Sequence, residues 1–148
     1  MMLTSDQKGA ITETAIAHAA TRLGIGVSKP LAAGERYDLI FDLHPGLLRV
    51  QCKWASLQDD VVVVRCYSSS RRRDGLVRRP YDADEIDAVA AYCAGNDRCY
   101  FFPVSTLAGQ RNLQLRLAPP RNNQGARIRW ASRFEFESLD WNELKLGP

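Results

Sequence analysis

The chain has 148 residues, enough for one domain with its own hydrophobic core, and 45% of them are hydrophobic. No apolar run approaches the roughly 20 residues of a membrane-spanning helix, and the polar N-terminus does not resemble a signal peptide. The four cysteines lack C-x-x-C spacing and neighbouring histidines, which argues against a zinc site and for a reduced, cytoplasmic chain. We therefore expect a single domain over residues 1–148 with no membrane partner.

The net charge of +3 is distributed unevenly along the chain. Residues 65–80 carry six arginines against one aspartate, residues 81–110 are acidic, and residues 111–148 carry seven basic against four acidic residues. Because the planar arginine side chain suits phosphate recognition, these blocks predict a polyanionic partner. For the run Arg71–Arg79, a solvated loop is an equally good interpretation.

The first predicted element is a helix over residues 4–23. Thr4 and Gln7 have the spacing of a capping box, and Gly24 stands where a glycine commonly ends a helix. The glycine-rich turn that follows leads into a brief strand.

Glu13 is unusual within this helix, because its neighbours one turn away are small or apolar. A carboxylate in such a stripe loses hydration when the helix packs, unless a cation or a hydrogen-bond donor meets it. The alternative is a position at the flank of the helix that reaches solvent near Lys8 or Arg22.

Residues 36–54 predict two strands joined by a tight turn at His44–Leu47. Polar and apolar side chains alternate in both halves, which is typical of strands with two different faces. With this turn, position i pairs with position 91 − i.

This register places Asp38 opposite Lys53 and Asp42 opposite Arg49. Cross-strand neighbours lie about 5 Å apart, so Asp38, Gln51 and Lys53 form one polar cluster on a single sheet face. Taken alone, such a face is more often simply solvated, with ordinary cross-strand ion pairs.

A second helix is predicted over Asp82–Cys93, because Asp82 is a good N-cap with Glu85 three residues later. The other expected elements are a central, two-sided strand at Val61–Cys66, a long loop at Tyr67–Pro80, strands at Arg98–Val104, Leu113–Leu117, Arg127–Trp130 and Phe134–Phe136, and a short helix in the acidic tail.

A helix bearing Glu13, a strand bearing Asp38 and an antiparallel strand bearing Gln51-x-Lys53 resemble the core of the PD-(D/E)XK nuclease superfamily. Nearly the whole chain is similar to the group I intron-associated homing endonucleases of this superfamily. The similar runs are KGAITETAIAHAATRLGIGVSKPL, YDLIFDL, LLRVQCKW, YDADEIDAVAAYCAGNDRCYFFPV and LQLRLAPPRNNQGARIRWASRFEF. The resemblance implies an α/β fold with a restriction-endonuclease-like core, a mixed central β-sheet flanked by helices. A β-rich C-terminal extension follows it.

The resemblance also implies roles for individual residues. Asp38 becomes the central metal ligand, Lys53 the catalytic lysine and Glu13 the acidic residue on the helix. Gln51 stands where most of the superfamily is acidic, although the intron-associated branch has glutamine there. The main-chain carbonyl of Cys52 is a further expected ligand, and the implied cofactor is Mg²⁺, for which Mn²⁺ can substitute.

The implied function is metal-dependent hydrolysis of phosphodiester bonds in double-stranded DNA by a homodimer or homotetramer, near the bacterial nucleoid. Arginines and amides are the expected DNA contacts. They are Arg71, Arg72, Arg73, Arg78, Arg79, Arg121, Asn122, Asn123, Gln124, Arg127 and Arg129.

Three alternatives remain open at this point. The first is a structure-selective nuclease such as a Holliday junction resolvase. The second is an inactive DNA-binding relative, which the neutral Gln51 favours. The third is an RNA-binding basic domain, for which the chain lacks an RNP-like aromatic motif.

Overall fold

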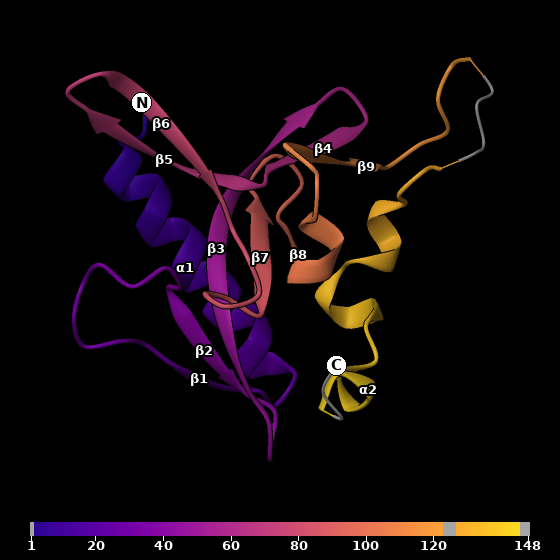
Figure 1. The fold of residues 1–148 in the computed structure, drawn as a ribbon. Helices are drawn as coiled ribbons and strands as arrows, with labels where there is room; N and C mark the ends of the chain where they lie inside the picture. Colours follow the sequence, from indigo (N-terminus) through magenta and orange to yellow (C-terminus); the bar gives the residue numbers. More distant parts are fainter. Residues whose placement is uncertain (1, 123–126, 146–148) are drawn as a thin grey trace.

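The computed structural model describes residues 2–122 and 127–145. It has a seven-stranded sheet, a separate two-stranded sheet, one long helix and several short turns of helix (Figure 1). The strands are β1 (Gly26–Ser28), β2 (Leu39–Asp42), β3 (Leu47–Gln58), β4 (Val61–Arg65), β5 (Tyr67–Arg72), β6 (Gly75–Pro80), β7 (Ala88–Cys93), β8 (Arg98–Pro103) and β9 (Asn112–Arg116). The helices are α1 (Ser5–Arg22), α2 (Trp141–Lys145) and the 3₁₀ turns η1 (Val104–Leu107), η2 (Ala131–Arg133) and η3 (Phe136–Ser138). No helix in these ranges is long and apolar enough to span a membrane.

Strand β3 is the centre of the sheet. The order is β1-β2-β3-β4-β9, and β7 and β8 add to β3 as a second branch. All pairings are antiparallel except that of β3 with β7, so the sheet is mixed, as expected. The two-stranded hairpin of β5 and β6 stands apart from it.

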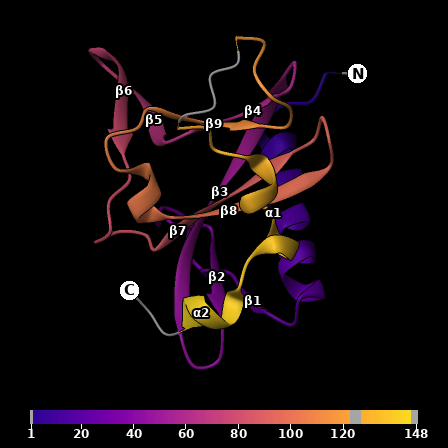
Figure 2. The same cartoon turned by 90° about the vertical axis from the view of Figure 1, so that its right-hand side faces the viewer.

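Helix α1 covers one face of the sheet, as the two perpendicular views agree (Figures 1 and 2). Its capping box forms as predicted, because Thr4 Oγ1 accepts from the Gln7 main-chain N–H at 3.1 Å and Gln7 Oε1 accepts from the Thr4 N–H at 2.9 Å. The buried Ile16 and Ala20 pack into a core with Phe41 of β2.

A second core lies on the opposite face and reaches under β4 and β9. Val62 and Val64 point into this core, whereas Val61 and Val63 on the other side of the strand are only half-buried. The prediction that this strand is buried on both faces is therefore wrong. Its outward face stays accessible.

The predicted helix Asp82–Cys93 is also wrong. Residues 82–87 form a turn, in which Asp82 Oδ1 accepts from the Asp84 N–H at 2.9 Å and the Asp82 carbonyl accepts from the Ile86 N–H at 3.1 Å. Residues 88–93 continue as β7, parallel to β3 and antiparallel to β8. A short, wholly buried apolar run fits a central strand as well as a helix, so its pattern does not separate the two.

Residues 67–80 form a β-hairpin, so the prediction of an unstructured loop is wrong. Tyr67 pairs with Pro80 at its base and Arg72 with Gly75 at its tip. Gly75 has a φ of 115°, which a residue with a Cβ rarely adopts.

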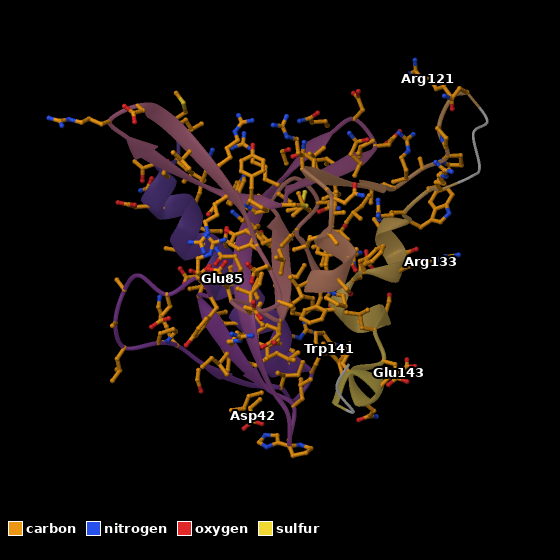
Figure 3. The ribbon with its side chains drawn as sticks, viewed as in Figure 1. Asp42, Glu85, Arg121, Arg133, Trp141 and Glu143 are labelled. Carbon is orange, nitrogen blue, oxygen red and sulfur yellow. The ribbon has the colours of Figure 1, made fainter. Side chains whose placement is uncertain are left out.

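Of the predicted β-rich extension, the strand expected at Leu113–Leu117 forms as β9, whereas no regular strand follows it among the described residues. Single bridges join Trp130 to Arg116 and Glu135 to Tyr100, and 3₁₀ turns lie between them. The expected short helix forms as α2, and its Trp141 ring lies 4.8 Å from Phe101 (Figure 3). Aromatic packing replaces strand pairing here.

Candidate active site

The strands β2 and β3 pair in a register shifted by two residues from the predicted one. Leu43 N–H donates to the Gly46 carbonyl at 2.7 Å, and Ile40 pairs with Arg49, so that positions i and 89 − i face each other. A shift of two residues keeps every side chain on its predicted face. The predicted pairing of Asp38 with Lys53 is lost, and Asp38 falls level with Gln51.

The predicted ion pair between Asp42 and Arg49 is likewise replaced. Arg49 Nε lies 3.1 Å from Asp87 Oδ2, and the same oxygen accepts from the Arg49 main-chain N–H at 2.7 Å. Asp42 Oδ1 instead accepts from the His44 N–H at 2.9 Å. Arg49 thus ties β3 to the turn before β7.

Asp38 lies just before β2. Its carboxylate accepts a main-chain hydrogen bond from β3, as a neighbouring strand would. Oδ2 accepts from the Cys52 N–H at 2.9 Å. Burial raises the pKa of Asp38, while the Cys52 hydrogen bond opposes the rise and the nearby Glu13 adds to it. A bound cation would stabilise the ionised carboxylate and so counteract this rise in pKa.

Glu13 reaches the same place from helix α1. It lines a cavity of about 810 Å³ together with Asp38 and Cys52. A cation does meet Glu13, as one interpretation of the sequence required, but it is Lys29, whose Nζ lies 2.8 Å from Glu13 Oε1. Lys8 and Arg22 make no ion pair among the described residues, and nothing in the sequence spacing links Lys29 to Glu13.

Gln51 and the main chain of Cys52 contact each other at this site. Gln51 Nε2 lies 3.4 Å from the Cys52 carbonyl oxygen, a long hydrogen bond. The two expected neutral ligands are therefore adjacent, and the Gln51 amide carries both a donor nitrogen and an acceptor oxygen.

Lys53 points to the other side of the sheet from Cys52. Its Nζ donates to the Tyr67 carbonyl at 2.8 Å and lies 5.0 Å from the centre of the Tyr81 ring. Burial lowers the pKa of Lys53 to about 8, and Asp38 opposes this shift through space. The predicted direct contact with Asp38 is wrong, because no ion pair joins the two side chains in the described part of the chain.

Arg36 was missed as a functional candidate, because the fold and not the sequence spacing brings it to Glu85 and Tyr81. Its guanidinium lies 4.5 Å from the Tyr81 ring centre, and Nε lies 2.9 Å from Glu85 Oε2 without hydrogen-bond alignment. Arg36 also donates to Ser68 Oγ at 2.6 Å and to the Pro80 carbonyl at 3.0 Å.

Glu85 completes what we call the hairpin clamp, formed by Arg36, Glu85 and Arg79. Arg79 Nη2 lies 3.0 Å from the same Glu85 Oε2 (Figure 3). The other oxygen, Oε1, is buried and has no hydrogen-bond partner within the described ranges. The clamp fixes the base of the β5–β6 hairpin beside Lys53.

The predicted DNA-contacting residues fall into two groups. The first is the β5–β6 hairpin, with Arg73 exposed in its turn, Arg78 stacked 5.0 Å from the Tyr67 ring centre and Arg79 held in the clamp. For Arg71 and Arg72 only the main chain, in β5, is described.

The second group lies beyond β9. Arg121 projects from the outer part of this segment (Figure 3), and Asn122, Arg127 and Arg129 line a cavity of about 520 Å³ with Arg111 and Arg116. Asn123 and Gln124 lie outside the described residues. Arg111 and Arg116 were missed, because only the fold brings them to the predicted residues.

The donor set fits a hard divalent cation. Two half-buried carboxylates share one cavity, and a neutral amide oxygen and a main-chain carbonyl stand nearby, all oxygen ligands of the kind Mg²⁺ prefers. Among the described residues no three histidines, cysteines or acidic residues gather into a metal cluster. With Gln51 at the third position, only two carboxylates are available.

The comparisons with known proteins agree with this architecture. The chain is similar to a solved structure described as a bacterial homing endonuclease, I-Ssp6803I, with 26% identity, a TM-score of 0.75 and coverage of 97% of this chain and 95% of that one. The shared fold is restriction-endonuclease-like. None of the curated proteins compared with the chain matches it. The model of the PD-(D/E)XK endonuclease family matches residues 3–137, and the chain therefore belongs to that family.

Proposed function

We propose that the chain is a divalent-metal-dependent endonuclease that hydrolyses phosphodiester bonds of double-stranded DNA at specific sites. The observation that carries the proposal is the meeting of Asp38 and Glu13 in one cavity, with Lys53 on the strand that borders it. Membership of the endonuclease family and the likeness to a homing endonuclease support it.

In this mechanism Asp38 and Glu13 would hold Mg²⁺, with Gln51 Oε1 and the Cys52 carbonyl as neutral ligands. When bound, the cation would supply positive charge at the scissile phosphate and lower the pKa of the attacking water. Lys53, with a pKa of about 8, is mostly protonated at neutral pH and donates to the phosphate oxygens as their negative charge grows. Lys29 must leave Glu13 for this ligand set to form.

Two basic arms would hold the DNA on either side of the site. The β5–β6 hairpin and the segment after β9 project toward the same side of the molecule, as Figures 1 and 2 agree. Their arginines are suited to neutralising phosphates. Since one site cuts one strand, double-strand cleavage calls for a symmetric homodimer or homotetramer.

The assignment is tested by Asp38→Ala and Lys53→Ala. Each change is expected to reduce Mg²⁺-dependent cleavage by at least about 100-fold while DNA binding persists. Cleavage is measured by sequencing the ends released from a library of duplex targets, with Mg²⁺ or with EDTA. Asn142→Ala on α2 is the control. A parental cutting rate in either site variant would refute the assignment.

A second candidate is a DNA-binding relative without catalysis. Two observations favour it: the third ligand position holds the neutral Gln51, and Lys29 already neutralises Glu13. In that case the parental chain binds duplex DNA but releases no ends with Mg²⁺ or Mn²⁺, and calorimetry detects no metal binding.

A further inference from the structure

The outward face of β3, β4 and β9 is rich in polar side chains. Register places Gln58 beside Val61 and Arg116, Ser56 beside Val63 and Gln114, and Arg65 beside Asn112. Paired residues share a face of the sheet, and the alternate residues Val62, Val64, Leu113 and Leu115 point into the core. We call the polar set the outer face: Ser56, Gln58, Arg65, Asn112, Gln114 and Arg116.

The outer face connects the candidate active site with the second group of arginines. The cavity that contains Glu13 and Asp38 is also lined by Arg65 and Asn112. Asn112 in turn lines the arginine-rich cavity beyond β9, together with Gln114. A polar groove therefore runs from the acidic pair to Arg111, Arg127 and Arg129.

Three side chains on this face are free to bind a ligand. Arg65, Asn112 and Gln114 are exposed, and none makes a side-chain hydrogen bond or ion pair within residues 2–122 and 127–145. By contrast, Arg116 Nε donates to the Ala118 carbonyl at 3.1 Å, and Gln58 Nε2 lies 3.5 Å from Ser56 Oγ.

We propose that Arg65, Asn112 and Gln114 read base edges in the major groove of the DNA, an inference that rests on the proposed nuclease function. Asparagine and glutamine amides pair with adenine and arginine pairs with guanine, each through two hydrogen bonds. Strands serve as reading elements in that groove in several DNA-binding proteins. The arginines of the second cavity would contact the phosphates at the edge of the groove. The residues of the outer face would then contact the bases, and these arginines the DNA backbone.

Strand β3 sets the spacing between reading and cutting. Cys52 belongs to the cutting site. Gln114 lies level with Ser56 across Val63, four residues along β3 from Cys52, and the same register continued places Arg65 and Asn112 level with Trp54, two residues from Cys52. At about 3.3 Å per residue these separations are roughly 7–13 Å. With about 3.4 Å per base pair, the bases read lie about two to four pairs from the cut.

The test is selection of bound sequences from a randomised duplex library in EDTA, so that cleavage does not intervene. The parental chain is expected to select a preferred sequence. Asn112→Ala and Gln114→Ala should each lose about 5- to 100-fold of the preference at one or two base pairs, while melting temperature and affinity for arbitrary duplex stay unchanged. Gln114→Glu should move its preference toward cytosine, whose amino group donates to a carboxylate.

Asn142→Ala on α2 is the matched control, because it removes an exposed amide outside the outer face. Preferences identical to the parental ones in both alanine variants would overturn the inference. So would a uniform loss of binding to all sequences, which would make these side chains phosphate contacts. Cleavage by the parental chain is measured separately, so that failure of base reading leaves the nuclease function intact and is distinguishable from its failure.

Discussion

Two carboxylates and two ammonium groups share the candidate active site. Lys29 pairs with Glu13 at 2.8 Å, and Lys53, on the strand that borders the cavity, donates to the Tyr67 carbonyl at 2.8 Å. Glu13 raises the pKa of Lys29 by hydrogen bonding, so this lysine stays charged at neutral pH. The site therefore attracts a divalent cation less strongly than one with three carboxylates would.

Restoring the third carboxylate tests this balance. Gln51→Glu is expected to tighten metal binding by roughly ten-fold, measured by calorimetry or terbium luminescence, because it adds a negative ligand. In EDTA the same change should lower the melting temperature through repulsion with Asp38, and Mg²⁺ should restore it. Gln110→Glu, at an exposed position distant from the acidic pair in sequence, is the control. Metal affinity equal to the parental value would exclude position 51 from the ligand set.

Substitution of Lys53 is expected to reduce cleavage activity and to increase the stability of the fold. Burial lowers its pKa from 10.5 to about 8, so the unfolded chain holds this proton more tightly than the folded one. The charged lysine thus costs stability below pH 8, and that cost disappears as pH rises from about 8 toward 10.5. Lys53→Met should abolish cleavage yet raise the melting temperature in EDTA by several degrees at pH 7, with the gain shrinking toward pH 10.

Lys8→Met, an exposed lysine on α1, is the matched control and should show no such pH-dependent difference. A Lys53→Met protein less stable than the parental one at pH 7 would mean that the contacts with Tyr67 and Tyr81 outweigh the cost of burial.

Among the elements, local patterns predicted those whose signals are local. The capping box and alanine-rich stripe identified α1, and strict alternation identified both strands of the central hairpin and the face of Asp38 and Lys53. The turn's hydrogen bonds decide register, and no spacing rule reveals them. The Asp82 pattern matches an N-cap, but the chain uses it for a turn into β7, because β3 and β8 supply the partners that make a strand there.

The candidate site divides in the same way between local and tertiary signals. The sequence singled out Asp38 and Glu13, which line one cavity, whereas Lys29 and the hairpin clamp depend on segments that only the tertiary fold brings together. The amides of the outer face were hidden for a similar reason, because residues 66–111 separate β4 from β9 in the sequence.

The hairpin clamp is expected to control the order of the β5–β6 hairpin. Arg36→Met removes the ion pair with Glu85 and the hydrogen bonds to Ser68 and Pro80. Trypsin should then cut after the hairpin arginines several-fold faster, because the base of the hairpin opens more often. Limited proteolysis with mass spectrometry measures this rate. Arg133→Met, at the exposed η2 turn, is the control, and unchanged protection in Arg36→Met would rule out the clamp.

At the scale of the whole molecule, basic residues gather in two arms on one side. If these arms neutralise six to ten phosphates, DNA affinity should fall by about 10³–10⁵ between 50 and 200 mM salt. Arg111→Gln and Arg129→Gln should each reduce the salt slope by about one. Arg133→Gln should leave it unchanged, because Arg133 lies on the η2 turn (Figure 3) and does not line the arginine-rich cavity. Equal affinity at low and high salt would contradict DNA binding by these arms.

The one-sided burial of β4 and β9 also bears on how the protein can change its target. Their inward side chains hold the core, and their outward side chains contribute nothing to it. Substitutions at positions 112 and 114 are therefore expected to leave folding intact, whereas Arg65 also lies close enough to lower the pKa of Lys53. If the outer face reads bases as proposed, a lineage, or an engineer, can retarget the protein through positions 112 and 114 at little risk to its stability.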